Sequence, residues 1–326
     1  MIFVFDLEGP LSPMDHAAEA MRIIGQKLGR SDFFEFFQML SLYDDELTLE
    51  KFPGYNPGDT LRLIAPIIST NLSDKELIAI SETATLTPGA KDLMGTLEMK
   101  DVYVASTSYT QHAQTIAKQL GILKENVNCT ELPKFKDFPH MDELLQIFEQ
   151  YKTSDIKSVK PDLDRAFWLD MEPKFLSTKV CGGQRKLDVV KRVSKERGAK
   201  ISEFMAVGDS ITDIHMLEGV AKGGGLAVSF NGNQYSAPKA NIAVSSMSLM
   251  AIKPLADAVD VWEFIKQWGI VQNKFKILPL ATSMYFKRSR IPLPFYDEVK
   301  KAKLPDIIRK QKEMRVAIRK EYATLT

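Results

Sequence analysis

The sequence predicts an α/β protein built on a doubly wound parallel sheet, with helices on both faces of the strands. Three observations predict this fold class. Short runs of β-forming apolar residues alternate with amphipathic helical segments along much of the chain. A block of consecutive helices interrupts this alternation after the first strand. Acidic or hydroxyl residues follow several strands directly, at the strand ends where parallel sheets bind ligands.

The composition is that of a globular protein of about two domains. Of its 326 residues, 44% are hydrophobic and 26% are charged, which is enough apolar material for a core. The net charge of +1 does not suggest a nucleic-acid partner. The two cysteines form no CxxC pair, which argues against a disulfide framework or a zinc site. Neither a signal peptide nor an apolar run of about 18 residues is recognisable, so we expect a cytoplasmic protein without a transmembrane segment.

The first part of the chain predicts one buried strand and a helical block. Residues 2–6, IFVFD, are a short β-rich run that ends in an acid. Apolar residues then recur at spacings of three and four over residues 14–82, which predicts about four helices. Asp32 and Ser73 are placed to cap two of them. Breaks are expected at Gly29, 53–58 and Asn71.

Helices and strands alternate through the following residues. The second strand is predicted at 102–105, running directly into Ser106, Thr107 and Ser108. Further strands are expected at 126–132, 204–209, 225–230 and 241–246. Helices are expected at 90–99, 111–122, 185–197, 214–221 and about 250–267. Such alternation favours a parallel sheet covered on both faces.

Two pairs of carboxylates are candidates for a catalytic or metal site. Asp6 and Glu8 lie two residues apart after the first strand, so in extended chain they project the same way. Asp209 and Asp213 are four apart and share a face if a helix has begun by Asp209. Carboxylates gathered in one pocket repel each other unless a cation joins them. Oxygen-rich ligation of this kind suits Mg²⁺.

Ser106 and Lys186 supply the groups that an anion needs. At the end of the second strand, the Ser106 hydroxyl lies beside the first N–H groups of the next helix, a place where anions bind. Lys186 adds a positive charge near the start of its helix. A nucleophilic carboxylate, a proton-handling carboxylate, a divalent cation, a hydroxyl and a lysine together fit phosphoryl transfer through an aspartyl phosphate. Each residue alone also fits a helix cap or a solvated side chain, so the prediction depends on their order.

Four segments, DLEGPL, VASTS, GGQRK and VGDSITD, resemble in this order the four motifs of the haloacid dehalogenase-like (HAD) superfamily. The longer segments LTPGAKDLMGTLEMKDVYVASTS and GGQRKLDVVKRV are most similar to its phosphoserine-phosphatase-like branch, as is a helical cap after the first motif. The resemblance covers residues 1–132 and 180–268. It implies a HAD core at 1–13, 86–133 and 179–270, a helical cap at 14–85, an insertion at 134–178 and a basic extension at 271–326.

The resemblance also implies a role for each candidate residue. Asp6 matches the nucleophile, and Glu8 matches the general acid and base, a position that usually holds Asp. The lysine of the third motif is matched by Lys186, which is expected to take part in catalysis together with Ser106. The residues implied to contact phosphate are Ser106, Thr107, Lys186 and Thr212. The implied Mg²⁺ ligands are Asp6, Glu8 through its backbone carbonyl, Asp209 and Asp213.

The function that follows is Mg²⁺-dependent hydrolysis of a small phosphorylated metabolite. Two alternatives remain open. In one, the phosphoryl group passes to an alcohol acceptor instead of water. In the other, the chain is an accessory subunit that keeps the HAD scaffold and docks a partner through its insertion and tail.

The tail differs from the body in charge. Residues 271–326 carry 14 Lys or Arg and 5 Asp or Glu, a net charge of +9, so residues 1–270 carry −8. Residues 304–322 are predicted to form an amphipathic helix whose apolar face includes Met314 and Tyr322. We expect this helix to dock on the acidic body; a partner protein or an anionic membrane surface is the alternative. Docking on the body would mostly bury Leu304, Ile307, Ile308 and Ile318.

Overall fold

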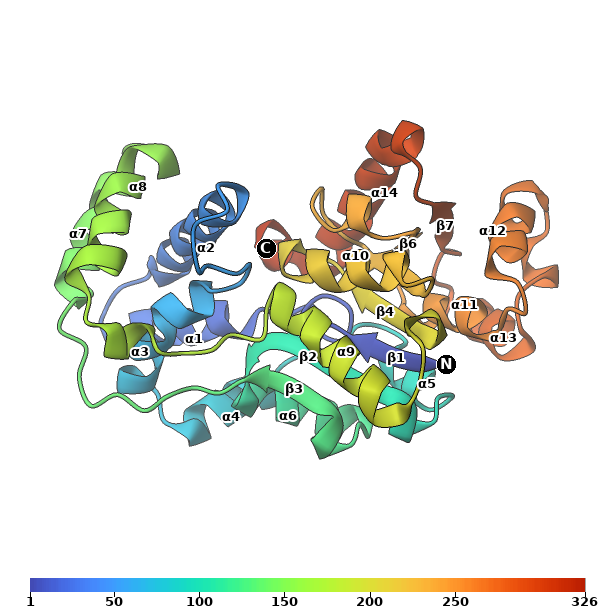
Figure 1. The fold of residues 1–326 in the computed structure, drawn as a ribbon, viewed down its shortest axis with the longest axis horizontal. Coiled ribbons are helices and arrows are strands. Elements are labelled where there is room, and N and C mark those ends of the chain that lie inside the picture. The colour runs from blue at the N-terminus through green and yellow to red at the C-terminus, as the bar shows by residue number, and fades with distance from the viewer. Residues whose placement is uncertain (326) are drawn as a thin grey trace.

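The computed structural model describes residues 1–325, and its centre is a seven-stranded sheet with the order β3-β2-β1-β4-β5-β6-β7 (Figure 1). Neighbouring strands from β3 to β6 pair in parallel, and β7 pairs with β6 antiparallel. The parallel strands are β1 (Ile2–Phe5), β2 (Val102–Tyr109), β3 (Val127–Thr130), β4 (Phe204–Gly208), β5 (Leu226–Phe230) and β6 (Ile242–Ser245). The predicted α/β fold class is therefore confirmed.

Helices cover both faces of this sheet, which explains why β1 (IFVF) and β4 (FMAVG) carry no polar side chain on either face. Ile2 and Val4 of β1 pack with residues of α9 (Gln184–Arg197) and α10 (Ile214–Lys222). The intervening Phe3 and Phe5 belong to the core of the opposite face. Helices that contribute to that second core include α5 (Ala90–Met94), α6 (Thr110–Leu120), α11 (Lys253–Asp257), α12 (Val261–Ile270) and α13 (Leu280–Ser289).

Four helices follow β1, with breaks where the sequence predicted them. They are α1 (His16–Lys27), α2 (Phe33–Leu49), α3 (Thr60–Asn71) and α4 (Asp74–Glu82). Ser73 caps α4 in a capping box with Glu76. Asp32 stands at the N-cap position of α2 but makes no capping hydrogen bond; its carboxylate instead pairs with Arg30 and Lys152.

Residues 134–178 extend this helical block. They form α7 (Met141–Tyr151) and α8 (Ile156–Arg165), which lie beside α2 (Figure 1). Ring contacts join the two parts, because Phe36 lies 5.3 Å from Phe148 and Tyr43 lies 6.0 Å from Phe167 between ring centroids. The insertion therefore shares an aromatic core with the helices that follow β1.

Several predicted boundaries were wrong. The helix expected at 90–99 ends at Met94. Strand β2 continues to Tyr109, so Ser106 lies within the strand and not at its end; pairing with β3 shifts register between Ala105 and Tyr109. The single helix expected at about 250–267 is two helices, α11 and α12. They separate because Asp260 adopts an extended backbone and caps the N–H groups at the start of α12.

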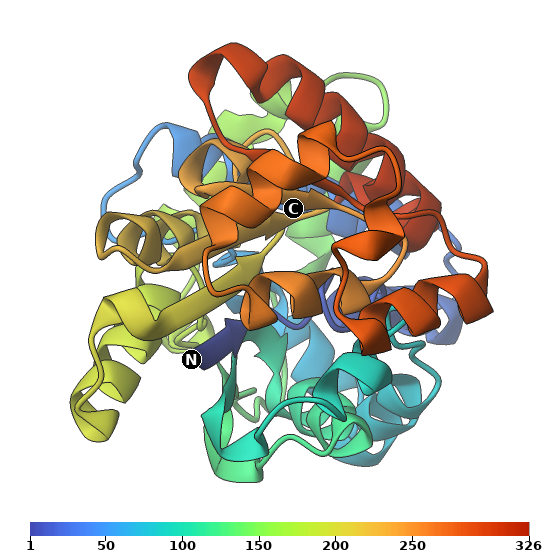
Figure 2. The ribbon, with the colours of Figure 1, turned by 90° about the vertical axis from the view of Figure 1, so that its right-hand side faces the viewer.

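The extension contributes a strand that the sequence analysis did not predict. Strand β7 (Phe295–Glu298) covers the edge of β6, and its Tyr296 packs edge-on against Trp268 with a centroid distance of 4.9 Å. Figure 2 views this side of the molecule, where helices of residues 253–289 gather in front of the strands. Within residues 1–325 no helix combines the length and the apolar character that crossing a membrane requires.

Helix α14 (Leu304–Arg319) forms as predicted and packs on the body, beside β6. Its buried face is not the expected apolar one. Of the four apolar side chains expected to be mostly buried, Ile307 is buried and the other three are half-buried. The buried residues are instead Ile307, Gln311, Arg315 and Arg319, which repeat every fourth position along one face.

Candidate active site

The candidate site lies at the carboxyl ends of β1 and β4, where the sequence placed it. The two strands are neighbours in the sheet, so Asp6 after β1 and Asp209 after β4 lie close together. Asp213 joins them, and all three are buried with carboxylate oxygens within 4.8 Å of one another. Three of the four residues predicted to ligate a metal therefore converge.

A tight turn, not the face of a helix, brings Asp213 to Asp209. A short 3₁₀ turn covers residues 211–213, and α10 begins only at Ile214. The Asp213 Oδ2 atom accepts the backbone N–H of Asp209 at 2.9 Å and that of Ser210 at 3.1 Å. Gly208 permits this approach, because a Cβ there would lie 2.4 Å from the carboxyl carbon of Asp213.

Lys186 is fully buried between the carboxylates. Its Nζ atom lies 2.9 Å from Asp6 Oδ2 and 2.7 Å from Asp213 Oδ1, and it donates to Thr212 Oγ1 at 3.1 Å. Burial lowers the pKa of Lys186, but the negative charges of Asp213 and Asp6 outweigh burial and raise the pKa above its usual value. The lysine is therefore a buried cation, and it contacts Thr212, one of the residues predicted to bind phosphate.

Glu8 lies apart from the three aspartates. Its Oε1 atom accepts the backbone N–H of His16 at 3.1 Å, at the start of α1. Burial, and next the charge of Asp15, raise the pKa of Glu8 to about 8. The Glu8 carboxyl group is not one of the clustered oxygens, so only its backbone carbonyl remains as the predicted ligand.

Ser106 and Thr107 are both buried on β2. The hydroxyl of Ser106 accepts the backbone N–H of Ser108 at 3.1 Å. A loop of the helical block reaches this side of the site, because a Cβ on Gly58 would lie 2.7 Å from the Thr107 methyl and 3.0 Å from that of Thr212. Thr107 and Thr212, two of the predicted phosphate-contacting residues, thus face a loop that belongs to the block between β1 and β2.

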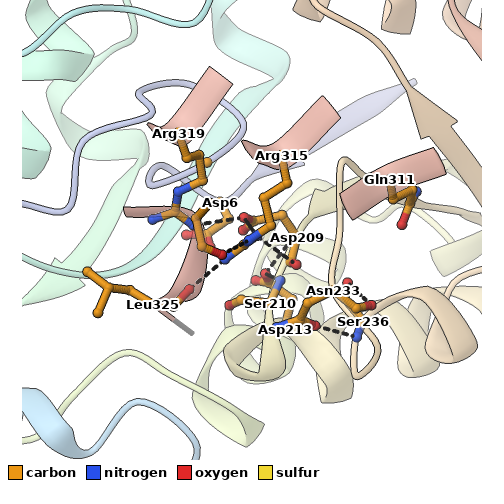
Figure 3. Close-up of polar contacts among 12 residues, drawn as sticks. Asp6, Asp209, Ser210, Asp213, Asn233, Ser236, Gln311, Arg315, Arg319 and Leu325 are labelled. Carbon is orange, nitrogen blue, oxygen red and sulfur yellow. Dashed lines mark hydrogen bonds and ion pairs between the residues drawn. The ribbon is translucent and has the colours of Figure 1, made fainter. Parts of the chain in front are cut away.

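Two arginines that the sequence analysis missed complete the site. Figure 3 shows Arg315 and Arg319 pointing from α14 toward Asp209. Arg315 Nη1 forms an ion pair with Asp209 Oδ2, and Arg319 Nη1 lies 3.0 Å from the same oxygen. Both arginines are buried. Burial lowers the pKa of Arg315 to about 10, so its guanidinium is still charged at neutral pH.

One signal in the sequence pointed to these arginines. Gln311 occurs four residues before Arg315, and Arg319 occurs four residues after it, which places all three on one helix face. The sequence analysis assigned the apolar residues of the tail to the buried face because their transfer from water is favourable. Burial of an arginine, in contrast, requires a partner charge. That partner, Asp209, is distant in sequence.

The donor set fits a hard divalent cation. Asp6, Asp209 and Asp213 offer only oxygen atoms, which Mg²⁺ prefers. Asp209 Oδ1 is buried and has no hydrogen-bond partner among residues 1–325, so one oxygen is available to a metal. Its Oδ2 atom, in contrast, faces the two guanidinium groups.

Comparisons with known proteins agree with this geometry. Residues 2–220 match the family described as haloacid dehalogenase-like hydrolase. Among solved structures, gene product AF1437 from Archaeoglobus fulgidus is similar with a TM-score of 0.77 and 26% identity, over 99% of this chain and 98% of that one. That similarity includes the C-terminal extension. The comparison with curated proteins gave no match.

Phosphoserine phosphatases share the fold over a smaller part of the chain. A phospho-aspartyl intermediate analogue of phosphoserine phosphatase has a TM-score of 0.52 at 17% identity, over 77% of this chain and 96% of that one. A substrate-bound phosphoserine phosphatase complex has a TM-score of 0.51 at 17% identity, over 77% and 95%.

Proposed function

Because this chain belongs to the family of haloacid dehalogenase-like hydrolases, we propose that it hydrolyses a small phosphate monoester through an aspartyl-phosphate intermediate, with Mg²⁺ as cofactor. One observation carries the proposal. Asp6 stands at the end of the central strand β1, next to a buried lysine and two further buried aspartates. A carboxylate held beside a cation in this way is suited to attack phosphorus while the charge of the phosphoryl oxygens is neutralised.

The Asp6 carboxylate is held from two sides before any substrate binds. Its Oδ1 atom accepts the backbone N–H of Leu7 at 2.7 Å, and its Oδ2 atom faces Lys186. Attack forms a bond between an Asp6 oxygen and phosphorus and breaks the bond to the ester oxygen. A fixed carboxylate lowers the barrier because no reorientation is needed.

Glu8 handles the proton in both steps of the proposal. Protonated Glu8 gives its proton to the leaving ester oxygen, and the resulting carboxylate then takes a proton from the water that attacks the aspartyl phosphate. Its anchor is the N–H of His16, the first residue of α1. The acid is thus anchored on the first residue of the helical block.

The phosphoryl oxygens are assigned to Ser106, Thr107, Lys186 and Thr212. Asp6, Asp209, Asp213 and the backbone carbonyl of Glu8 would hold Mg²⁺, which supplies further neutralisation of phosphoryl charge when bound. Ser106 and Thr107 are placed on β2, and Thr212 already touches Lys186. These groups come from β2, α9 and the turn after β4, and the proposal assigns them to one phosphoryl position next to Asp6.

The experiment is a panel of phosphorylated metabolites incubated with the purified chain and MgCl₂, with release of inorganic phosphate as the readout. We expect turnover of at least one ester, and none by an Asp6→Asn variant. Adding a primary alcohol separates hydrolysis from transfer, because transfer yields a new phosphate ester in place of phosphate. No phosphate or new ester from any compound, with Mg²⁺ or Mn²⁺, would contradict the proposal.

A further inference from the structure

The C-terminal residues 304–325, which we call the strap, bind both to the sheet and to the helical block. On the sheet side, the Gln311 amide donates to the Ser229 carbonyl at 2.6 Å and accepts the Ser229 hydroxyl at 2.9 Å. On the other side, Tyr322 donates its hydroxyl to Glu19, and Glu321 pairs with Arg22 at 3.0 Å. The strap therefore bridges the two parts of the molecule across the candidate site.

The guanidinium of Arg315 is held in place by the strap itself. Its Nε atom donates to the carbonyl of Ala323 at 2.9 Å and its Nη2 atom to the carbonyl of Leu325 at 2.6 Å. The remaining nitrogen, Nη1, contacts Asp209 (Figure 3). Since the final residues of the strap fold back onto Arg315, its position is built by the chain and is not that of a loose side chain.

Arg319 is held in a similar way. Its Nε atom donates to the carbonyl of Pro13 at 3.3 Å, while Nη1 contacts Asp209 Oδ2. Two positive charges thus meet one oxygen of a carboxylate. Arg315 and Arg319 thus bring two further positive charges to a pocket that already holds three aspartates and Lys186.

The two guanidinium groups on Asp209 oppose the binding of a further cation at that carboxylate. A divalent ion next to Asp209 would lie beside two buried guanidinium groups, and like charges repel strongly where water is excluded. Without the arginines the same pocket would hold three carboxylates against one lysine. The two guanidinium groups therefore supply the positive charge that a divalent cation would otherwise supply next to Asp209.

We propose that the strap and Mg²⁺ compete for Asp209, so that residues 304–325 are an autoinhibitory segment that withdraws its arginines when the metal binds. This inference rests on the metal site of the proposed function. Two features make withdrawal reversible. The ion pair that fastens the strap to α1 is exposed, and exposed pairs contribute little. A cavity of about 340 Å³, lined by Leu42, Gly232 and Arg315 among others, gives the arginine room to move.

The first test measures Mg²⁺ binding by titration calorimetry, without substrate. We expect Arg315→Gln/Arg319→Gln to bind Mg²⁺ at least tenfold more tightly than the wild-type chain. The matched control is Lys312→Gln/Arg309→Gln, which removes the same charge from exposed positions of the strap and should bind Mg²⁺ like wild type. Equal or weaker binding by the first variant, or no binding by any chain, would overturn the inference.

A second variant loosens the strap from its far end. Glu321→Gln/Tyr322→Phe removes the contacts to Arg22 and Glu19 and leaves the site unchanged. It should also bind Mg²⁺ more tightly than wild type, which keeps the inference testable if the arginine variant fails to fold. An unchanged affinity for Mg²⁺ would count against the proposal that the strap moves when the metal binds.

Hydrogen exchange of the wild-type chain reports the movement directly. Adding saturating Mg²⁺ should increase amide exchange in residues 315–325, while exchange in β1 and β4 stays constant. Mg²⁺ binding with no change in the strap would overturn the inference. If the strap and Mg²⁺ compete but no phosphatase activity is found, only the proposed function is contradicted. If the chain is an active phosphatase but amide exchange in the strap does not change with Mg²⁺, only this inference is contradicted.

Discussion

Lys186 Nζ lies 2.9 Å from Asp6 Oδ2, and both side chains are almost wholly withdrawn from water. The same nitrogen lies 2.7 Å from Asp213. A single lysine therefore separates two carboxylates that would otherwise face each other in a medium of low dielectric. Removing one charged member leaves its partner buried and unpaired. This costs more folding free energy than burying no charged group there at all.

Lys186→Met should reduce the free energy of unfolding by about 3–5 kcal/mol, because two buried carboxylates lose their partner. Urea unfolding at pH 7 measures this change. The double variant Lys186→Met/Asp213→Asn should be more stable than Lys186→Met alone, since one of the unpaired charges is gone. A loss below about 1 kcal/mol for the single variant, the range of exposed pairs, would contradict the buried ion pair.

Asp6→Asn should reduce turnover of the best substrate by about 10³-fold or more, because an amide is a poor nucleophile. The fold should persist, since Lys186 keeps Asp213 as a partner. Steady-state kinetics and circular dichroism check both statements. Asp188→Asn is the matched control on the exposed face of α9 and should keep wild-type activity. Turnover by Asp6→Asn within tenfold of wild type removes Asp6 from the mechanism.

Glu8→Gln should separate the two chemical steps. With an aryl phosphate, whose leaving group needs little protonation, the aspartyl phosphate should still form, and it should accumulate because no base prepares the water. With an alkyl phosphate, formation itself should fall by about 10²–10⁴-fold. Mass spectrometry of the intact chain detects the phosphorylated form. Equal losses with both esters and no trapped intermediate would argue against Glu8 as the acid and base.

Two stacked histidines make stability depend on pH. His16 and His112 are buried with ring centroids 4.6 Å apart. Burial lowers the pKa of His16 to about 4, and burial followed by the charge of His16 lowers the pKa of His112 well below its usual value. The unfolded chain therefore binds more protons below about pH 6.5, and stability falls as the pH falls through that value.

His112→Phe should weaken this dependence. For one histidine the loss between pH 6.5 and pH 5 is about 2 kcal/mol, and phenylalanine keeps the stacked shape without the titrating group. Urea unfolding at pH 7 and pH 5 should show a smaller difference for the variant, by about that amount. The same difference in both chains would mean that His112 does not remain neutral in the folded state.

The sequence was sufficient to predict the residues whose surroundings are local. Asp6, Asp209 and Lys186 follow strands or begin helices with clear patterns, and a parallel sheet gathers such ends at one edge. The helical block was equally predictable, since its apolar periodicity is regular and its breaks contain turn residues. The end of β2 was not predictable in the same way, because strand boundaries depend on pairing with β3, and β2 continues past Ser106.

What the sequence could not predict depends on distant partners. Strand β7, FYDE, is short, carries two acids and does not alternate, so only its pairing with β6 identifies it. The polar face of α14 is buried because Ser229 and Asp209 complement it. Hydrophobic periodicity assigns the buried face by transfer free energy alone. That criterion fails for a helix face whose charged side chains are buried in ion pairs.

Because β7 closes the edge of the sheet, the order of synthesis matters for this protein. A ribosome that adds 5–20 residues per second needs roughly 3–10 s to pass from the end of β6 to the start of β7. During that interval the backbone groups of β6 have no partner on one side, and an open strand edge can pair with another nascent chain. Faster elongation through residues 246–294 should therefore improve the yield of native protein in a cell-free translation system, and slower elongation should favour aggregates.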